Sequence, residues 1–394
     1  MLINSRPKIV LSITDAFCLG FLRGQAKYLK DHGYDVYLFC PEGEGLDAYG
    51  ELEGCTVVKI PYKREISLMD DLNCLFITYK QFKKIKPDVI NVGTPKAGLI
   101  GVMAGAFSGV KNRIFTLRGL RSTAEPEGMQ KKIVEFMEKL THYFATKIIS
   151  ITPSMANYGF QNGILKPNKT VVLAKASSNG INVDRFSPSN ASVPQVELLR
   201  AELGIKPDDF VFGFVGRVVK SKGIEEIYLA FKNLKNKFSN IKLLIVGPVE
   251  LTSDAVDADI LKEMENDNSV IMAGKRKDVE FCYQIMNVFT LPSHNFREGF
   301  GNVAMEASAS GIPIIVTRGA GCQDAVIDGK TGLLIDPKNQ LALQEAFEFY
   351  YKHPEKCIEH GVAGSKYANE FFRNEVIWKA QVQLYKSLLG KNKK

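Results

Sequence analysis

Apolar residues along this chain fall into short continuous runs that alternate with longer segments of helical spacing. In the first half, the short runs predict buried strands at residues 8–13, 34–40, 56–60, 88–92, 113–117 and 147–151. Between them, the helical spacing predicts helices at residues 21–32, 71–85, 96–108, 127–145 and from 153 onwards. This alternation is typical of a parallel sheet with helices on both faces.

The same alternation begins again in the second half. It predicts strands at residues 210–215, 241–246, 269–273, 287–291, 312–317 and 332–335, helices from 222 and over 254–266 and 278–286, and a helical tail over 338–390. Between the halves, residues 177–194 are rich in Ser, Asn and Pro, which predicts a linker. A chain of 394 residues is too long for one ordinary core, so we expect two α/β domains, at residues 1–179 and 180–373.

Sheets of this kind bind ligands at the carboxyl ends of their strands. In the first half, the loops at this edge are residues 14–20, which include Gly20, and residues 93–96 and 118–126. In the second half, the loop after strand 287–291 has the most distinctive composition: it begins at Pro292 and holds His294, Arg297, Glu298, Gly299, Phe300 and Gly301.

A helix is predicted directly after this loop, with Asn302 as its cap and Gly311 near its end. Free backbone amides and the positive end of a helix form an anion site. Glu298 and Glu306, eight positions apart, add carboxylates that accept paired hydrogen bonds from neighbouring hydroxyls. The pattern therefore predicts a ligand with phosphate in its middle and a polyol at each end, as in a nucleotide sugar. The expected contacts are Gly299, Phe300, Gly301, Asn302, Val303 and Glu306.

Two cations follow the strand at 210–215, where the sequence reads Gly213-Phe-Val-Gly-Arg-Val-Val-Lys-Ser-Lys-Gly223. Arg217 and Lys222 at the carboxyl end of a strand suit a diphosphate.

The Glu-x7-Glu stretch resembles the signature of glycosyltransferase family 4, whose members are retaining enzymes of the GT-B fold. Residues 179–186 resemble that family's linker, and residues 61–66 and 93–98 resemble its subgroup for capsule and exopolysaccharide synthesis. The resemblance implies two Rossmann-like lobes facing across a cleft, the first binding the acceptor and the second the nucleotide sugar. It also implies that the last helix, within 374–394, crosses back to the first lobe.

The resemblance further implies roles for single residues. Glu298 contacts the donor sugar, Glu306 contacts the ribose, and Arg217 and Lys222 hold the diphosphate, so that Glu298, Arg217 and Lys222 are the expected catalytic residues. The backbone near Arg276 is expected to read the base; uracil is favoured and guanine stays open. Gly20 is assigned to the donor as well.

The expected acceptor contacts are Lys96, Arg118 and Arg121, as cations for a diphosphate. Many family members have His at the position of Arg118, and that His reaches the donor sugar, so its role is not transferred here. His294 and Asp15 are candidate general bases by position only. Retaining members are thought to use the departing phosphate oxygen instead, and a base is then not needed.

We expect no cofactor and no essential metal, with Arg217 and Lys222 taking the place of a cation. The only Asp-x-Asp, at 257–259, is interpreted as part of a helix face. Seven scattered cysteines without a CxxC pair are interpreted as reduced residues of a cytosolic protein.

Charge is divided unevenly between the halves. Residues 1–190 hold 25 Lys and Arg against 17 Asp and Glu, a net of +8, whereas residues 191–394 hold 26 of each sign. The basic half suggests an anionic partner, and nucleic acid, an anionic membrane surface or a diphosphate ligand would each fit. No run of about 18 apolar residues predicts a spanning helix. We therefore expect a cytoplasmic enzyme, peripheral at the inner face of the plasma membrane.

The leading hypothesis is transfer of a sugar from a UDP-sugar to a lipid-diphosphate-linked saccharide in bacterial surface polysaccharide synthesis. A GDP-sugar (mannosyl) transferase and a nucleotide-sugar 2-epimerase of the same fold are alternatives. A nucleic-acid-binding protein has no motif in its favour, so no nucleic-acid partner is expected. A dehydrogenase is disfavoured because no Gly-x-Gly-x-x-Gly follows the first strand.

Overall fold

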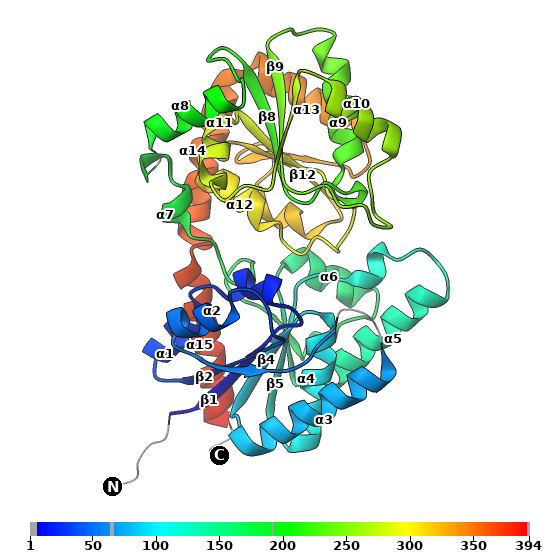
Figure 1. Ribbon diagram of the computed structural model, residues 1–394, viewed down its shortest axis with the longest axis vertical. Helices are drawn as coiled ribbons and strands as arrows, with labels where there is room; N and C mark the ends of the chain where they lie inside the picture. Colours follow the sequence, from blue (N-terminus) through cyan, green and yellow to red (C-terminus); the bar gives the residue numbers. More distant parts are fainter. Residues whose placement is uncertain (1–5, 64–66, 191, 392–394) are drawn as a thin grey trace. The chain divides into compact units, whose positions relative to one another are not determined.

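The computed structural model describes residues 6–63, 67–190 and 192–391. The chain divides into two compact units (Figure 1). Unit 1 comprises the chain up to Gly180 together with the segment from Asn374, and unit 2 comprises Ile181–Arg373. The sequence placed these divisions at 179/180 and 373/374. The motif at 61–66 falls partly on residues 64–66, which lie outside the described residues.

Unit 1 contains a parallel sheet of seven strands within the described residues, in the order β3-β2-β1-β4-β5-β6-β7. The strands are β1 (Lys8–Ser12), β2 (Asp35–Cys40), β3 (Thr56–Lys59), β4 (Val89–Gly93), β5 (Asn112–Leu117), β6 (Lys147–Ser150) and β7 (Thr170–Val172). The order reverses between β1 and β4, so the loops that follow these two strands meet at the switch point where ligands bind in such sheets.

The helices of unit 1 are α1 (Gln25–Asp31), α2 (Leu46–Glu53), α3 (Leu68–Ile85), α4 (Pro95–Ser108), α5 (Met129–Phe144), α6 (Pro153–Gln161) and α15 (Asn374–Lys391), with 3-10 turns η1 (Ala16–Leu22) and η2 (Arg121–Ala124). Helices α3, α4 and α5 lie side by side, as Figure 1 shows. Helix α15 packs on α1 and supplies Val382 and Tyr385 to the core around β1 and β2. The predicted return of the last helix to the first domain is confirmed.

Unit 2 has a parallel sheet of six strands among its described residues, in the order β10-β9-β8-β11-β12-β13. These are β8 (Phe210–Val215), β9 (Ile241–Val246), β10 (Val270–Gly274), β11 (Val288–Leu291), β12 (Ile314–Thr317) and β13 (Gly332–Ile335). Its helices are α7 (Val183–Phe186), α8 (Val193–Glu202), α9 (Ile224–Lys235), α10 (Ala258–Asn266), α11 (Val279–Ile285), α12 (Asn302–Ala309), α13 (Gln340–Lys352) and α14 (Pro354–Phe371), with 3-10 turns η3 (Pro188–Asn190), η4 (Lys220–Lys222) and η5 (Gly321–Ala325). Two parallel α/β units confirm the predicted fold class.

Several local predictions were wrong. The predicted loop 14–20 is largely the turn η1, which Asp15 caps by accepting a hydrogen bond from Phe17 N at 2.8 Å. The helix expected from residue 21 begins at Gln25, because Gly24 has φ +78° and separates it from η1. The helix expected from residue 222 begins at Ile224, after the turn η4 and the left-handed Gly223.

The Ser-, Asn- and Pro-rich stretch at 177–194 is not an open linker. Residues 176–181 are buried, and α7, η3 and the start of α8 occupy most of the remaining stretch. Asn179 accounts for much of this order: its Oδ1 accepts a hydrogen bond from Trp378 Nε1 at 2.6 Å, and its Nδ2 donates to the Arg23 carbonyl at 2.9 Å. In an open linker such polar side chains would face solvent. Here Asn179 bonds to the backbone and to α15 instead.

Candidate functional site

In unit 2 the sheet order reverses between β8 and β11, so the loops after these two strands are neighbours. His294 N donates to the Ser221 carbonyl at 3.0 Å, which joins the loops directly. Gly223 lies at the closest approach: a Cβ there would be 2.4 Å from the Pro292 carbonyl oxygen. The cations predicted from the first loop and the carboxylate predicted from the second therefore meet at one place.

The helix that follows the motif is α12, and Gly301 rather than Asn302 occupies its cap position. Gly301 has φ +72°, a left-handed conformation that asparagine adopts at a cost and glycine adopts freely. Asn302 and Val303 thus form the first turn of the helix, and Glu306 follows one turn later. The order of strand, loop and helix N-terminus that the sequence predicts is present in the structure.

Glu298 and Lys222 form an ion pair in which Lys222 Nζ donates to Glu298 Oε2. Both side chains are largely buried, with 18% of Lys222 and 13% of Glu298 exposed. Ser293 Oγ lies 3.5 Å from the same carboxylate. Each member of such a pair orients the other, and losing either one would leave an uncompensated charge in a largely buried place.

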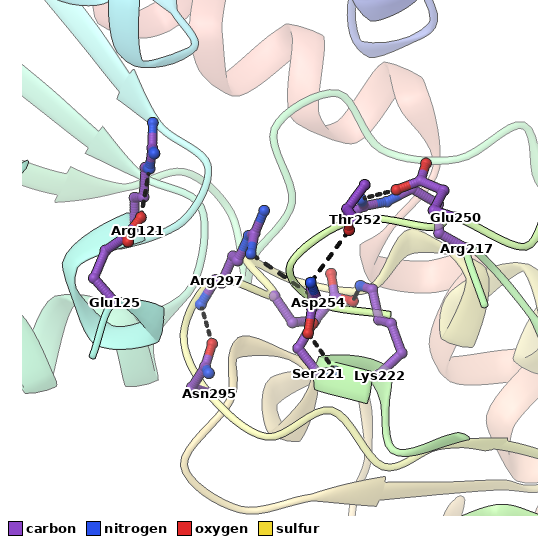
Figure 2. Close-up of polar contacts among 11 residues, drawn as sticks. Arg121, Glu125, Arg217, Ser221, Lys222, Glu250, Thr252, Asp254, Asn295 and Arg297 are labelled. Atoms are coloured by element: carbon purple, nitrogen blue, oxygen red, sulfur yellow. Dashed lines mark hydrogen bonds and ion pairs between the residues drawn. The ribbon is translucent and has the colours of Figure 1, made fainter. Parts of the chain in front are cut away.

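Arg217 is also paired, with its Nη1 donating to Glu250 Oε2 at 2.7 Å. Glu250 lies in the loop between β9 and α10, and Asp254 of the same loop accepts a hydrogen bond from Ser221 N at 3.0 Å. Arg297 Nη1 is 3.7 Å from Asp254 as well. Figure 2 shows these contacts. Each of the basic residues named here thus has a carboxylate partner within its own unit, and an anionic ligand would compete with those partners.

Glu306 lies in the second turn of α12. Tyr283 orients it, because the Tyr283 hydroxyl donates a hydrogen bond to Glu306 Oε2 at 3.0 Å. Burial raises the pKa of Glu306 above its usual value, and the hydrogen bond from Tyr283 partly offsets that effect. The Tyr283 hydroxyl is also 3.2 Å from the Val303 carbonyl oxygen. Sequence reasoning missed Tyr283. It sits in α11, and no local pattern links that helix to the motif.

Two other residues assigned to the donor have buried or engaged side chains. Phe300 is 2% exposed and stacks on Phe372 with ring centroids 5.1 Å apart, so its ring is a core group and only its backbone is left for a ligand. Arg276 Nε donates to Asp278 Oδ1 at 2.9 Å and its Nη1 to Glu202 Oε1 at 2.8 Å. The carboxylates fix the Arg276 side chain, and the predicted role of its backbone does not depend on it.

The two candidate bases occupy different units. His294 Nε2 lies 3.0 Å from Glu226 Oε1, and both side chains are mostly buried. Asp15 caps η1, the turn in unit 1 that also carries the exposed Gly20. Both candidate bases thus make structural contacts within their own units.

In unit 1 the three predicted acceptor cations separate into two groups. Lys96, at the start of α4, is buried and pairs with Asp71 of α3 at 2.8 Å. Arg121 pairs with Glu125 at 2.8 Å and lines the same cavity as Lys96. Arg118 is not among the residues that line this cavity, although its neighbours Leu117 and Gly119 are. Alternation along the extended chain turns it to the other side.

Arg118 is set into the protein interior beside Gly93, where an added Cβ would be 1.6 Å from Arg118 Nη1. Its Nε and Nη1 are buried and have no hydrogen-bond partner among the described residues. Burial lowers the pKa of Arg118 to about 10. The sequence predicts a cation at a loop surface, and the structure places this guanidinium much deeper.

Two threonines that the sequence did not single out shape the same edge. Thr14 Oγ1 accepts a hydrogen bond from Ala97 N at 3.0 Å, and so caps α4 from 83 residues away. Thr94 has φ +69° and ψ 149°, which is rare for a β-branched residue, and its hydroxyl is 2.6 Å from that of Thr14. Backbone strain of this kind is concentrated at ligand sites.

Two family models match the chain: glycosyl transferases group 1 over residues 195–366, and glycosyl transferase 4-like over residues 8–152. CapM of Staphylococcus aureus, a capsular polysaccharide biosynthesis glycosyltransferase, is 34% identical over 97% of this chain and 97% of its own length. The N,N'-diacetylbacillosaminyl-diphospho-undecaprenol alpha-1,3-N-acetylgalactosaminyltransferase of Campylobacter jejuni is 28% identical over 81% of this chain and 82% of its own.

Among solved structures, Anabaena Alr3699/HepE in complex with UDP-glucose matches with a TM-score of 0.78, over 96% of this chain and 99% of that one, at 18% identity. That likeness concerns the fold alone, and it agrees with the two Rossmann-like units described above. The assignment of this chain to a family rests on its 34% identity to CapM, which spans almost the full length of both proteins. This chain belongs to the group 1, family 4-like glycosyltransferases and has their GT-B fold.

Proposed function

We propose that this glycosyltransferase moves a hexose or an N-acetylhexosamine from a UDP-sugar to a lipid-diphosphate-linked saccharide during synthesis of a bacterial surface polysaccharide. The name of CapM supports a role in capsular polysaccharide synthesis, and the name of the Campylobacter relative supports a saccharide linked to a lipid diphosphate as the acceptor. The structure of HepE with UDP-glucose supports a UDP-sugar as the donor. The main observation behind the proposal is the ion pair between Lys222 and Glu298 at the switch point of the unit 2 sheet.

On this proposal the donor lies along the motif. Its diphosphate replaces Glu250 as the partner of Arg217 and Glu298 as the partner of Lys222. Glu298, released from Lys222, then accepts hydrogen bonds from the sugar hydroxyls. Glu306, oriented by Tyr283, accepts hydrogen bonds from the ribose. The backbone around Arg276, with Gly299, Phe300, Gly301, Asn302 and Val303, completes the donor contacts.

We further propose that the reaction retains the configuration at the sugar's anomeric carbon. The bond from that carbon to the phosphate oxygen breaks, and its electron pair goes to the diphosphate, which Arg217 and Lys222 stabilise. The acceptor oxygen bonds to the same face of the carbon and gives its proton to the departing phosphate oxygen. The alpha linkage in the Campylobacter relative's name supports this course, because a sugar that is alpha-linked to its nucleotide keeps that configuration in an alpha-linked product.

The acceptor is proposed to bind in unit 1, through Lys96 and Arg121 and without Arg118, which does not line their cavity, while the enzyme lies at the inner face of the plasma membrane. Within the described residues, none of the helices has the length and apolar character to cross a bilayer. The excess positive charge of residues 1–190 supports contact with an anionic surface.

The first test is a panel of UDP- and GDP-sugars screened by thermal shift, followed by NMR of the product with the preferred donor. We expect UDP-sugars to raise the melting temperature and the product to carry the donor's configuration, since a ligand at about 100 times its Kd stabilises by roughly 2.7 kcal/mol. Stabilisation by GDP-sugars alone would refute the donor assignment. An inverted product would refute retention, and a 2-epimer formed without acceptor would show an epimerase.

A further inference from the structure

A cavity of about 320 Å³ lies within unit 1, at the carboxyl edge of its sheet. The loop after β1, the start of α4, the end of β5 and one face of α5 enclose it. Phe115, Leu117, Val134 and Met137 form an apolar floor. The volume is at the lower end of the roughly 300–1,000 Å³ typical of small-molecule sites.

Two cations border this apolar floor. Lys96 is only 7% exposed and is held by Asp71 at 2.8 Å, whereas Arg121 reaches solvent and is held by Glu125. Burying an ammonium group beside apolar side chains is costly unless it is paired. Two acids line the cavity as well. Glu138 accepts a hydrogen bond from the Ser122 hydroxyl at 2.7 Å, and Asp15 accepts one from Phe17 N at 2.8 Å. The cavity thus offers an apolar interior with two cations at its border, and both of its acids already accept hydrogen bonds from the protein.

A neighbouring face of α5 is also apolar and is exposed. Met129, Ile133 and Phe136 are not among the residues that line the cavity, and Phe136 is 65% exposed. Phe17, on the turn η1 beside the cavity residue Cys18, is exposed too. Two neighbouring faces of α5 therefore carry apolar side chains, one at the cavity and one exposed to solvent, as expected where a hydrocarbon chain passes from a bilayer to a protein interior.

We propose that this cavity binds the part of a polyprenyl chain next to the diphosphate of the lipid-linked acceptor. The first isoprene units lie on Phe115, Leu117, Val134 and Met137, and Lys96 and Arg121 contact the diphosphate. A saccharide would need hydrogen-bonding groups over the floor, whereas an isoprenoid needs only apolar surface. The inference rests on the proposed acceptor class, and it adds recognition of the lipid itself.

The test uses the full chain, without membrane or detergent, and titrates it calorimetrically with farnesyl diphosphate, geranyl diphosphate and inorganic diphosphate. We expect farnesyl diphosphate to bind at least about tenfold more tightly than inorganic diphosphate, because each buried methylene adds affinity. Geranyl diphosphate should fall between them. Equal affinity for all three probes would overturn the proposal.

Two variants locate the effect. Val134→Trp fills the cavity from α5, and Phe136→Trp enlarges a side chain on the exposed face of the same helix. Val134→Trp should remove the preference for farnesyl diphosphate and keep the affinity for inorganic diphosphate, while Phe136→Trp should bind all three probes as the wild type does. Met137→Trp, at a less buried position, replaces Val134→Trp if that variant fails to bind UDP or to melt cooperatively.

The outcomes separate this inference from the proposed function. If cavity-filled variants keep the farnesyl preference while the enzyme glycosylates a prenyl-diphosphate acceptor, the cavity assignment is wrong and the proposed function stands. If the preference depends on Val134 but prenyl-diphosphate saccharides are not substrates, the cavity binds isoprenoids and the proposed acceptor is wrong.

Discussion

At the scale of single residues, Glu298 and Lys222 neutralise each other in the unliganded protein. Glu298→Ala should therefore lower turnover by about 10²-fold or more, because a hydroxyl contact in the transition state is lost. Affinity for UDP should stay the same or rise, since Lys222 is freed for the diphosphate. Steady-state kinetics and UDP calorimetry measure the two effects. A variant that loses UDP binding in proportion to its turnover would contradict a role at the sugar.

The pair Glu306 and Tyr283 predicts a pH dependence. Because burial raises the pKa of Glu306, its carboxylate takes up a proton at a pH above the usual value of 4.5. Binding of uridine, which has no phosphate to titrate, should therefore weaken as pH falls through that raised pKa. Tyr283→Phe removes a hydrogen bond that lowers this pKa, so the midpoint should move to higher pH. Glu306→Gln should show no such midpoint; an unchanged profile would exclude the ribose contact.

We propose that no metal is required, because Arg217 and Lys222 supply the positive charge for the diphosphate. Arg217→Ala should lower turnover by about 10²-fold, the usual loss for one preorganised charge-stabilising group. Glu250→Gln is the matched control, because it removes the partner of Arg217 and keeps the cation. Wild-type activity should be unchanged in EDTA. Loss of activity in EDTA that Mg²⁺ restores would contradict the metal-free proposal.

The sequence predicted the two glutamates and the two cations because each sits in a short motif with its own chemical meaning. It did not predict Tyr283, Glu250 or Asp71, whose importance comes only from the side chains they meet. These pairings join α11, the β9–α10 loop and α3 to distant loops. Such contacts follow from tertiary packing, which no local pattern encodes.

At the scale of elements, the strands were predicted best: β8, β9 and β13 have the expected bounds. Continuous apolar runs identify buried parallel strands, and little else competes with that interpretation. Helix starts were less predictable. Gly24, Gly223 and Gly301 each take a positive φ, and these backbone conformations decide where α1, α9 and α12 begin.

We propose that the enzyme contacts a membrane through helix α5. Its exposed face combines Met129, Ile133 and Phe136 with Lys132 and Lys139, which are also exposed. Lys132→Glu with Lys139→Glu should weaken sedimentation with anionic vesicles, and binding by the wild type should fall with salt, because each basic residue contributes about 1 kcal/mol at an anionic surface. Lys232→Glu with Lys235→Glu, in unit 2, is the control pair. Binding indifferent to salt would contradict this proposal.

At the scale of the whole molecule, unit 1 is assembled from both ends of the chain. Tyr385 of α15 is fully buried, and its hydroxyl accepts a hydrogen bond from Asn91 of β4 at 2.6 Å. A chain ending at Arg373 should keep UDP binding and a cooperative transition for unit 2, while unit 1 loses its own transition in calorimetry. Two undiminished transitions would show that α15 is dispensable for the core.

The return of α15 to unit 1 has a consequence for synthesis on the ribosome. Unit 2 is continuous in sequence and has all its residues once Arg373 has left the exit tunnel. Unit 1 is translated first but lacks Val382 and Tyr385 until the end, so its apolar sheet face stays uncovered while the other half is made. The first half of this protein to be synthesised thus completes its core last, and the apolar residues that pack on α15 stay exposed on the nascent chain until then.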